Sequence, residues 1–156
     1  LAQEAGPRIG VLELGGWDTH FDQERRLTQL FQNLSAGIVE FKQGLGKHWQ
    51  STAIVVVSEF GRTAAENASR GTDHGTGGIA MLAGGAVNGG RIIGDWPGLN
   101  ERDLWEGRDL AAVNSYESLF KGVLLDHLSV GANVLNNTVF PESKAMRPTA
   151  GLFKSV

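Results

Sequence analysis

The chain has 156 residues, of which 41% are hydrophobic and 20% are charged, and its formal net charge is −3. This composition is that of a folded globular protein of one ordinary domain, residues 1–156, and it is too apolar for a disordered chain. The only adjacent basic pair, Arg25 and Arg26, lies among acidic residues, so the basic stripe that nucleic-acid binding needs is missing. The lack of cysteine excludes disulfides, thiolate metal sites and cysteine nucleophiles. No apolar run approaches the roughly 18 residues of a membrane-spanning helix, so no membrane span is expected.

The first elements of the chain are predicted from its apolar pattern. Residues 8–14 are short, apolar and partly β-branched, and two glycines follow them, which favours a buried strand. Residues 23–45 repeat apolar side chains at three- and four-residue intervals, which predicts a helix with Asp22 as its N-terminal cap. Residues 51–58 form an unbroken, valine-rich run, which predicts a central strand buried on both faces.

A polar, glycine-rich stretch follows the second predicted strand. Residues 61–78 are rich in Gly, Thr, Ser, Asn and Asp, which indicates a long connection, and long connections in small domains are usually functional. Residues 79–82 then predict a third strand. Residues 91–94 are short and apolar enough to pair as an edge strand before the next turn.

The last predicted element with a clear pattern is a second amphipathic helix. It covers residues 115–128, with Asn114 or Ser115 as its cap. The full order is therefore strand, helix, strand, loop, strand, helix. This order predicts an α/β fold with three layers, α/β/α, around a mostly parallel, doubly wound sheet. In such sheets ligands bind beyond the carboxyl ends of the strands.

Short polar stretches follow each of the three predicted strands and contain candidate metal ligands. These candidates are Asp18, His20, Glu59, Asp73 and His74. Carboxylate and neutral imidazole without thiolate favour zinc, manganese or iron over calcium. Because each stretch follows a strand of one parallel array, we expect Asp18, Glu59 and His74 to converge at one edge of the sheet.

Each candidate ligand also has an interpretation without function. Asp18 and His20 are typical of a turn that caps the next helix, and Glu59 is typical of a solvated acid at a strand end. Asp73 and His74 lie between glycines, a composition that favours a surface turn. Convergence of the three stretches in space would favour the metal site over these separate interpretations.

Anion binding and nucleophilic catalysis have weaker candidates. Arg62 is a candidate anion-binding residue because guanidinium binds phosphate or sulfate through paired donors, although an arginine beside acids is more often a structural ion pair. The hydroxyls of Thr19, Ser58 and Thr72 are nucleophiles in principle, but none lies in the glycine-flanked elbow that marks one. The sequence therefore identifies no catalytic residue.

Three motifs carry a resemblance to a known family. Residues 15–20 (GGWDTH), 55–63 (VVVSEFGRT) and 71–78 (GTDHGTGG) resemble the bacterial domain of unknown function family 1501, DUF1501, whose members are similar to alkaline phosphatases and sulfatases. The resemblance implies an alkaline-phosphatase-like fold, of which this chain is the C-terminal part. It also implies metal binding by Asp18, His20 and His74, with Glu59 at the position of a further ligand.

The function implied by this resemblance is metal-dependent hydrolysis of phosphate or sulfate esters. Zinc is the favoured cofactor, with manganese or calcium as alternatives, and the implied partners are a small-molecule ester and the N-terminal remainder of the parent domain. Glu59 and Phe60 stand where the superfamily has an Asp–His pair, and the superfamily's nucleophile lies in a half that these residues do not match. We therefore expect an incomplete active site and no ester hydrolysis by this chain alone. The resemblance also implies an extracytoplasmic bacterial location.

Two functions of other classes remain open from the residues. One is a noncatalytic metal-binding or interaction module that retains the fold, which the Glu59–Phe60 pair and the missing nucleophile favour. The other is a carbohydrate- or surface-binding module that would use tryptophans as platforms, although scattered tryptophans are more often core or rim residues.

Overall fold

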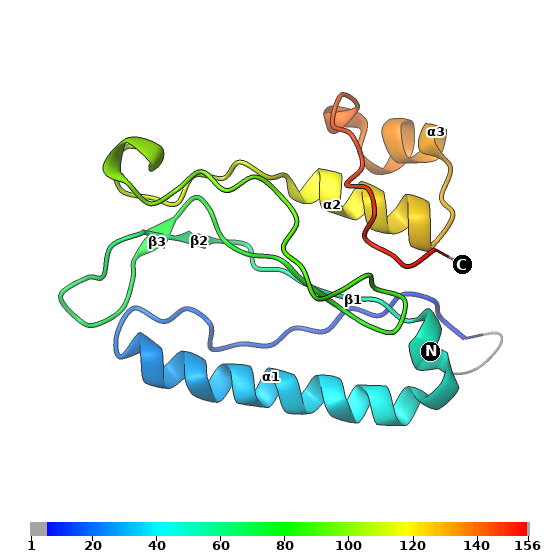
Figure 1. Cartoon of the computed structure of the whole chain (residues 1–156), viewed down its shortest axis with the longest axis horizontal. Helices are drawn as coiled ribbons and strands as arrows, with labels where there is room; N and C mark the ends of the chain where they lie inside the picture. Colours follow the sequence, from blue (N-terminus) through cyan, green and yellow to red (C-terminus); the bar gives the residue numbers. More distant parts are fainter. Residues whose placement is uncertain (1–5, 156) are drawn as a thin grey trace.

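The computed structural model describes residues 6–155, which form a mixed α/β structure with two small antiparallel sheets (Figure 1). In the first sheet β1, Ile54–Val56, pairs with β4, Met81–Ala83. In the second sheet β2, Gly61–Arg62, pairs with β3, His74–Gly75. The second sheet and the loop between its strands carry the candidate ligands Asp73 and His74.

Helices lie on two sides of these strands (Figure 1). The long helix α1, Gln23–Leu45, lies on one side, and α2, Tyr116–Gly122, and α3, Ala132–Val134, lie on the other. Shorter helical turns are Gly46–Ser51, Glu101–Asp103 and Pro141–Ser143 of the 3-10 type, and Val123–His127 and Leu135–Val139 of the π type. Among the described residues, none of these helices has both the length and the hydropathy to cross a membrane.

The helix predicted over residues 23–45 is confirmed as α1, but its N-terminus is not capped as expected. Asp22 adopts a left-handed backbone conformation with φ 47°, and its carboxylate accepts a 2.6 Å bond from Arg25 Nε instead of capping the helix. The backbone N–H groups of Asp22 and Gln23 donate to the carbonyls of Ser69 and Arg70 at 3.1 and 2.9 Å. The loop between β2 and β3 therefore satisfies two of the N–H groups at the start of the helix that have no acceptor within it.

The strand predicted over residues 8–14 is not formed. This segment makes no backbone hydrogen bond to the rest of residues 6–155, and its apolar side chains are exposed, with Val11 at 91% and Leu12 at 86%. A strand needs a hydrogen-bonded neighbour, and none of the described strands pairs with this segment. Residues 91–94 likewise form no edge strand, and Ile92 is fully exposed at 100%.

The mostly parallel, doubly wound sheet that the element order predicts is not observed in residues 6–155 either. The run over residues 51–58 does contain a strand, but β1 has three residues, is half-buried, and has only β4 as a described neighbour. Parallel neighbours need a long crossover, usually a helix. Between β1 and β4 the chain forms the β2–β3 hairpin instead, so it returns in the opposite direction, with Val55 opposite Leu82.

The second helix is confirmed over residues 116–122 and continues as a π-helical turn to His127. Its cap is Ser115, whose Oγ accepts bonds from the N–H groups of Glu117 and Ser118 at 3.1 and 3.3 Å. The buried apolar residues lie mainly around this helix and the C-terminal tail, and they are Leu45, Val87, Leu119, Leu135 and Leu152. The tail joins them through a bridge between Val87 and Phe153.

Replacing Ser115 with alanine should lower the free energy of unfolding by about 1 kcal/mol, because two N–H groups at the start of α2 lose their acceptor. The midpoint of urea unfolding measures the loss. Ser51 provides a matched Ser→Ala control. It is exposed, it is the last residue of a 3-10 turn, and its hydroxyl donates to the His48 carbonyl. An unchanged midpoint in Ser115→Ala would show that water replaces the cap.

Candidate metal centre

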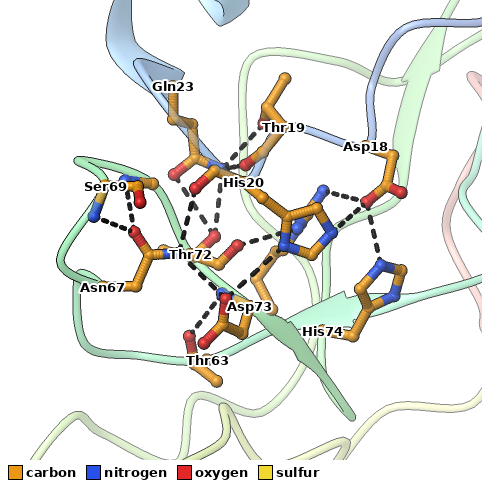
Figure 2. Close-up of polar contacts among 12 residues, drawn as sticks. Asp18, Thr19, His20, Gln23, Thr63, Asn67, Ser69, Thr72, Asp73 and His74 are labelled. Carbon is orange, nitrogen blue, oxygen red and sulfur yellow. Dashed lines mark hydrogen bonds and ion pairs between the residues drawn. The ribbon is translucent and has the colours of Figure 1, made fainter.

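Three candidate ligands converge on one oxygen atom. Asp18 Oδ1 lies 2.8 Å from His20 Nε2 and 2.9 Å from His74 Nε2. The ligand atoms of these three residues all lie within 4.8 Å of one another, and Figure 2 shows both imidazole rings turned toward the Asp18 carboxylate. The structure thus brings together residues that are distant in the sequence, since His20 and His74 are 54 positions apart.

Arg62 on β2 holds this cluster in place through hydrogen bonds. Its Nη2 donates to Asp18 Oδ1 and to the carbonyl of Trp17, both at 3.0 Å, and its Nη1 donates to the carbonyl of Thr72 at 3.0 Å. Arg62 also pairs in register with His74 across the β2–β3 sheet. One guanidinium therefore connects the loop of Asp18, the loop that precedes His74, and the strand between them. An anion at Arg62 would compete with these bonds.

Thr19 anchors the chain between Asp18 and His20. Its side chain is fully buried, and its Oγ1 and carbonyl accept bonds from Gln23 Nε2 at 3.0 and 3.3 Å. The same Gln23 nitrogen lies 3.0 Å from Thr72 Oγ1 (Figure 2). Because Gln23 is the first residue of α1, the start of the helix fixes both ligand-bearing loops relative to each other.

The imidazole rings are also held by aromatic contacts. The rings of His20 and His74 stack with centroids 4.8 Å apart and planes at 28°, and the Phe60 ring lies 4.8 Å from His74. The ligand side chains still reach solvent, with exposed fractions of 55% for Asp18, 38% for His20 and 51% for His74. The cluster is therefore an open site at the surface rather than a closed structural centre.

Asp73 lies beside this cluster but outside the ligand group. Its Oδ1 is 3.6 Å from His20 Nδ1, on the edge of the ring opposite the atom that faces Asp18 (Figure 2). Its Oδ1 also accepts a 2.9 Å bond from Asn67 Nδ2. His20 thus has a carboxylate on each side.

Both carboxylates at His20 are held in the charged form. Partial desolvation acts to raise the pKa of Asp18, but the charges of His20, His74 and Arg62 together outweigh it and leave the pKa below its usual value. The hydrogen bond from Asn67 is the main cause that lowers the pKa of Asp73, and contact with His20 adds to it against partial desolvation. Both groups are therefore negatively charged at neutral pH.

The donor set fits a zinc-type ion. In a tetrahedral site with bonds of about 2.0–2.1 Å, neighbouring ligand atoms lie about 3.3 Å apart. Asp18 Oδ1 is 2.8 and 2.9 Å from the two imidazole nitrogens, so these two separations would have to lengthen by about half an ångström to admit an ion. The two nitrogens lie within 4.8 Å of each other and would have to settle at a similar spacing. Two imidazoles and one carboxylate form the ligand type of catalytic zinc sites, which leave a position for water or substrate.

Glu59 is not part of this cluster. It is exposed and lines a separate shallow hollow of about 260 Å³ together with Thr76 and the start of α2. The Ser58 hydroxyl donates a 2.7 Å bond to the Phe60 carbonyl, which turns the chain after β1, and the Phe60 ring rather than the Glu59 carboxylate contacts His74. Of the three residues expected to converge at one sheet edge, the structure joins Asp18 and His74.

The hydroxyl groups considered as nucleophiles are engaged elsewhere. Thr19 is fully buried, Thr72 exchanges hydrogen bonds with Gln23, and the Ser58 hydroxyl bonds to the Phe60 carbonyl.

Sequence reasoning missed Asn67. Its Oδ1 accepts bonds from the N–H groups of Ser69 and Gly71 at 2.9 and 3.1 Å, which is the local turn pattern that asparagine favours. The composition of residues 67–71 indicated a turn, but the contacts of Asn67 Nδ2 with His20 and Asp73 depend on the tertiary structure.

The comparisons with known proteins identify the family of the chain. No curated protein and no solved structure matches it. The model of one family, described as "Protein of unknown function (DUF1501)", matches residues 1–138, which include the whole candidate metal centre. The chain therefore belongs to the DUF1501 family.

Proposed function

We propose that the chain is the metal-binding part of a hydrolase for phosphate or sulfate esters, with a zinc ion held by Asp18, His20 and His74. The observation that carries the proposal is the convergence of one carboxylate oxygen and two imidazole nitrogens within 4.8 Å. Manganese is the first alternative to zinc, and calcium the second because imidazole is a poor ligand for it.

In such a site the ion would polarise an ester oxygen and lower the pKa of a bound water. The residues of this chain have separate tasks around it. Asp18 supplies charge, and His20 and His74 supply neutral nitrogen ligands. Arg62 holds Asp18 in place and adds positive charge beside the cluster, which would attract an ester anion.

We propose further that the chain completes an alkaline-phosphatase-like domain together with the rest of its parent. The arrangement of helices on two sides of the strands agrees with three layers (Figure 1). Residues 8–14 have apolar side chains at successive positions, which is the pattern of an inner strand that is covered on both faces. In this structure these side chains are exposed. In this proposal the segment becomes a strand when neighbouring strands pair with it.

A noncatalytic metal-binding module is the second candidate. The observation that favours it is the engagement of the candidate hydroxyls, since Thr19 is buried and Ser58 and Thr72 bond to neighbouring residues. A metal without an activated nucleophile can only activate water, and an open site stabilises a transition state poorly. The two candidates therefore share the metal centre and differ in activity.

Zinc titration by calorimetry, followed by assays on aryl phosphate and aryl sulfate esters, tests this proposal. We expect the chain to bind a single zinc ion at the one ligand group found among residues 6–155 and to show no detectable hydrolysis, whereas the intact parent hydrolyses one ester class in a chelator-sensitive manner. Absence of zinc binding would overturn the metal centre. Zinc binding with an inactive parent would favour the noncatalytic module, and turnover by the chain itself would reveal a nucleophile among its own residues.

A further inference from the structure

Asp73 and His20 form an arrangement that recurs behind metal ligands. The Nε2 atom of His20 faces Asp18, and its Nδ1 atom faces the Asp73 carboxylate at 3.6 Å. A histidine that binds a metal usually donates its other ring N–H to a carboxylate or carbonyl, which fixes the ring and its tautomer. At 3.6 Å the pair is just beyond hydrogen-bond length, and a small rotation of the ring would close it.

The Asp73 carboxylate is itself held in place. Its Oδ1 accepts the 2.9 Å bond from Asn67, and its main chain exchanges bonds with Thr63, whose N–H and Oγ1 contact the Asp73 carbonyl and N–H at 3.0 and 3.1 Å. Asp73 therefore cannot swing toward the ion without breaking its contact with Asn67. Its position behind His20 is determined by the loop.

Asn67 holds the loop against the main chain of His20. The same Nδ2 group that donates to Asp73 also donates to the His20 carbonyl at 3.0 Å, while Oδ1 binds the N–H groups of Ser69 and Gly71 (Figure 2). A Cβ at Gly71 would run into the His20 backbone, so the loop packs directly on this residue. One asparagine therefore positions the Asp73 carboxylate relative to both the backbone and the ring of His20.

We propose that Asp73 and Asn67 are positioning residues that orient His20 to bind the ion through Nε2, and that Asp73 is not a metal ligand. This inference rests on the proposed metal centre. It assigns the ring proton of metal-bound His20 to Nδ1, directed at Asp73. It also predicts that loss of either residue weakens zinc binding without changing the ligands.

The test compares the variants Asp73→Asn and Asn67→Ala with the wild type and with Asn33→Ala, an exposed asparagine of α1 that serves as control. Zinc affinity is measured by competition with a chromophoric chelator, cobalt(II) absorption reports the ligands, and ¹⁵N NMR of the imidazoles reports the tautomer of His20. We expect both variants to bind zinc about 10–100-fold more weakly, as for other outer-sphere partners of metal ligands. The cobalt spectrum at saturation should keep its shape.

The NMR result separates positioning from general stability. In the zinc-bound wild type the ring proton of His20 should lie on Nδ1. In the metal-free Asp73→Asn protein the population of this tautomer should fall below its wild-type value, although the unfolding midpoint of the metal-free protein stays the same. A changed cobalt spectrum in Asp73→Asn would show that Asp73 is a ligand. Wild-type zinc affinity in both variants would show that neither residue positions His20. Either result overturns the inference and leaves the proposed metal centre standing. A wild type that binds no zinc overturns the metal centre and the inference together.

Discussion

Replacing His74 with alanine is expected to lower the zinc affinity of the protein by more than about 100-fold, because the loss of a direct ligand must exceed the 10–100-fold effect of an outer-sphere partner. The change removes one of two imidazoles from a group with only three described ligands. The fold should persist, because the His74 side chain is 51% exposed and its strand pairing with Arg62 uses the backbone. Calorimetric titration with zinc measures the loss.

The matched control is His48→Ala, which removes an imidazole from the turn after α1 and leaves the metal centre intact. Both variants should keep the unfolding midpoint of the metal-free wild type to within a small shift. Equal zinc affinity in His74→Ala and wild type would reject His74 as a ligand. A His48→Ala variant as weak as His74→Ala would show that zinc binds elsewhere.

The variant Glu59→Gln separates two predictions about zinc binding, one from the sequence pattern and one from the structure. The pattern made Glu59 a ligand, so removal of its charge would weaken zinc binding. The structure places Glu59 in the separate hollow beside α2, which predicts wild-type affinity for this variant. Reduced affinity would mean that the chain after β1 rearranges when the ion binds.

Local patterns predicted the helices well because helical hydrogen bonds form within one segment. The apolar repeat of residues 23–45 coincides with the bounds of α1, and Ser115, one of the two predicted caps, caps α2. The predicted cap of α1 was wrong because the Asp22 carboxylate pairs with Arg25 and Arg70 instead of the helix N–H groups. The N–H groups of Asp22 and Gln23 bond to a loop more than forty residues away, which no local pattern contains. Amphipathic periodicity thus fixed the helix but not its contacts.

Strands were predicted less well because pairing depends on distant residues. Residues 8–14 have the composition of a buried strand but lack a partner among the described residues, and the run over residues 51–58 shortens to β1 with a single neighbour. Three of the five candidate ligands, Asp18, His20 and His74, nevertheless lie together. Arg62 joins the loops of Asp18 and Thr72 directly, so their convergence does not require the parallel sheet from which it was inferred.

A buried lysine shows a further limit of the pattern. Lys121 lies in α2 off the predicted apolar face, where a solvated charge is the usual expectation, yet its side chain is fully buried. Its Nζ donates to Asn136 Oδ1 at 3.0 Å and to the carbonyls of Ser143 and Met146 at 2.5 and 3.1 Å. All three acceptors belong to the C-terminal segment, so the ammonium group links that segment to α2 through hydrogen bonds.

Lys121→Met should therefore lower the free energy of unfolding by about 3 kcal/mol, because methionine fills a similar volume and leaves three part-buried acceptors without their donor. Urea unfolding measures the loss, and the exposed Lys144→Met on the same segment is the matched control, with an expected change within about 0.5 kcal/mol. Because α2 and the C-terminal segment lie apart from the metal centre, zinc affinity should stay unchanged in both variants. A Lys121→Met protein as stable as Lys144→Met would mean that apolar packing of the methionine offsets the three lost hydrogen bonds.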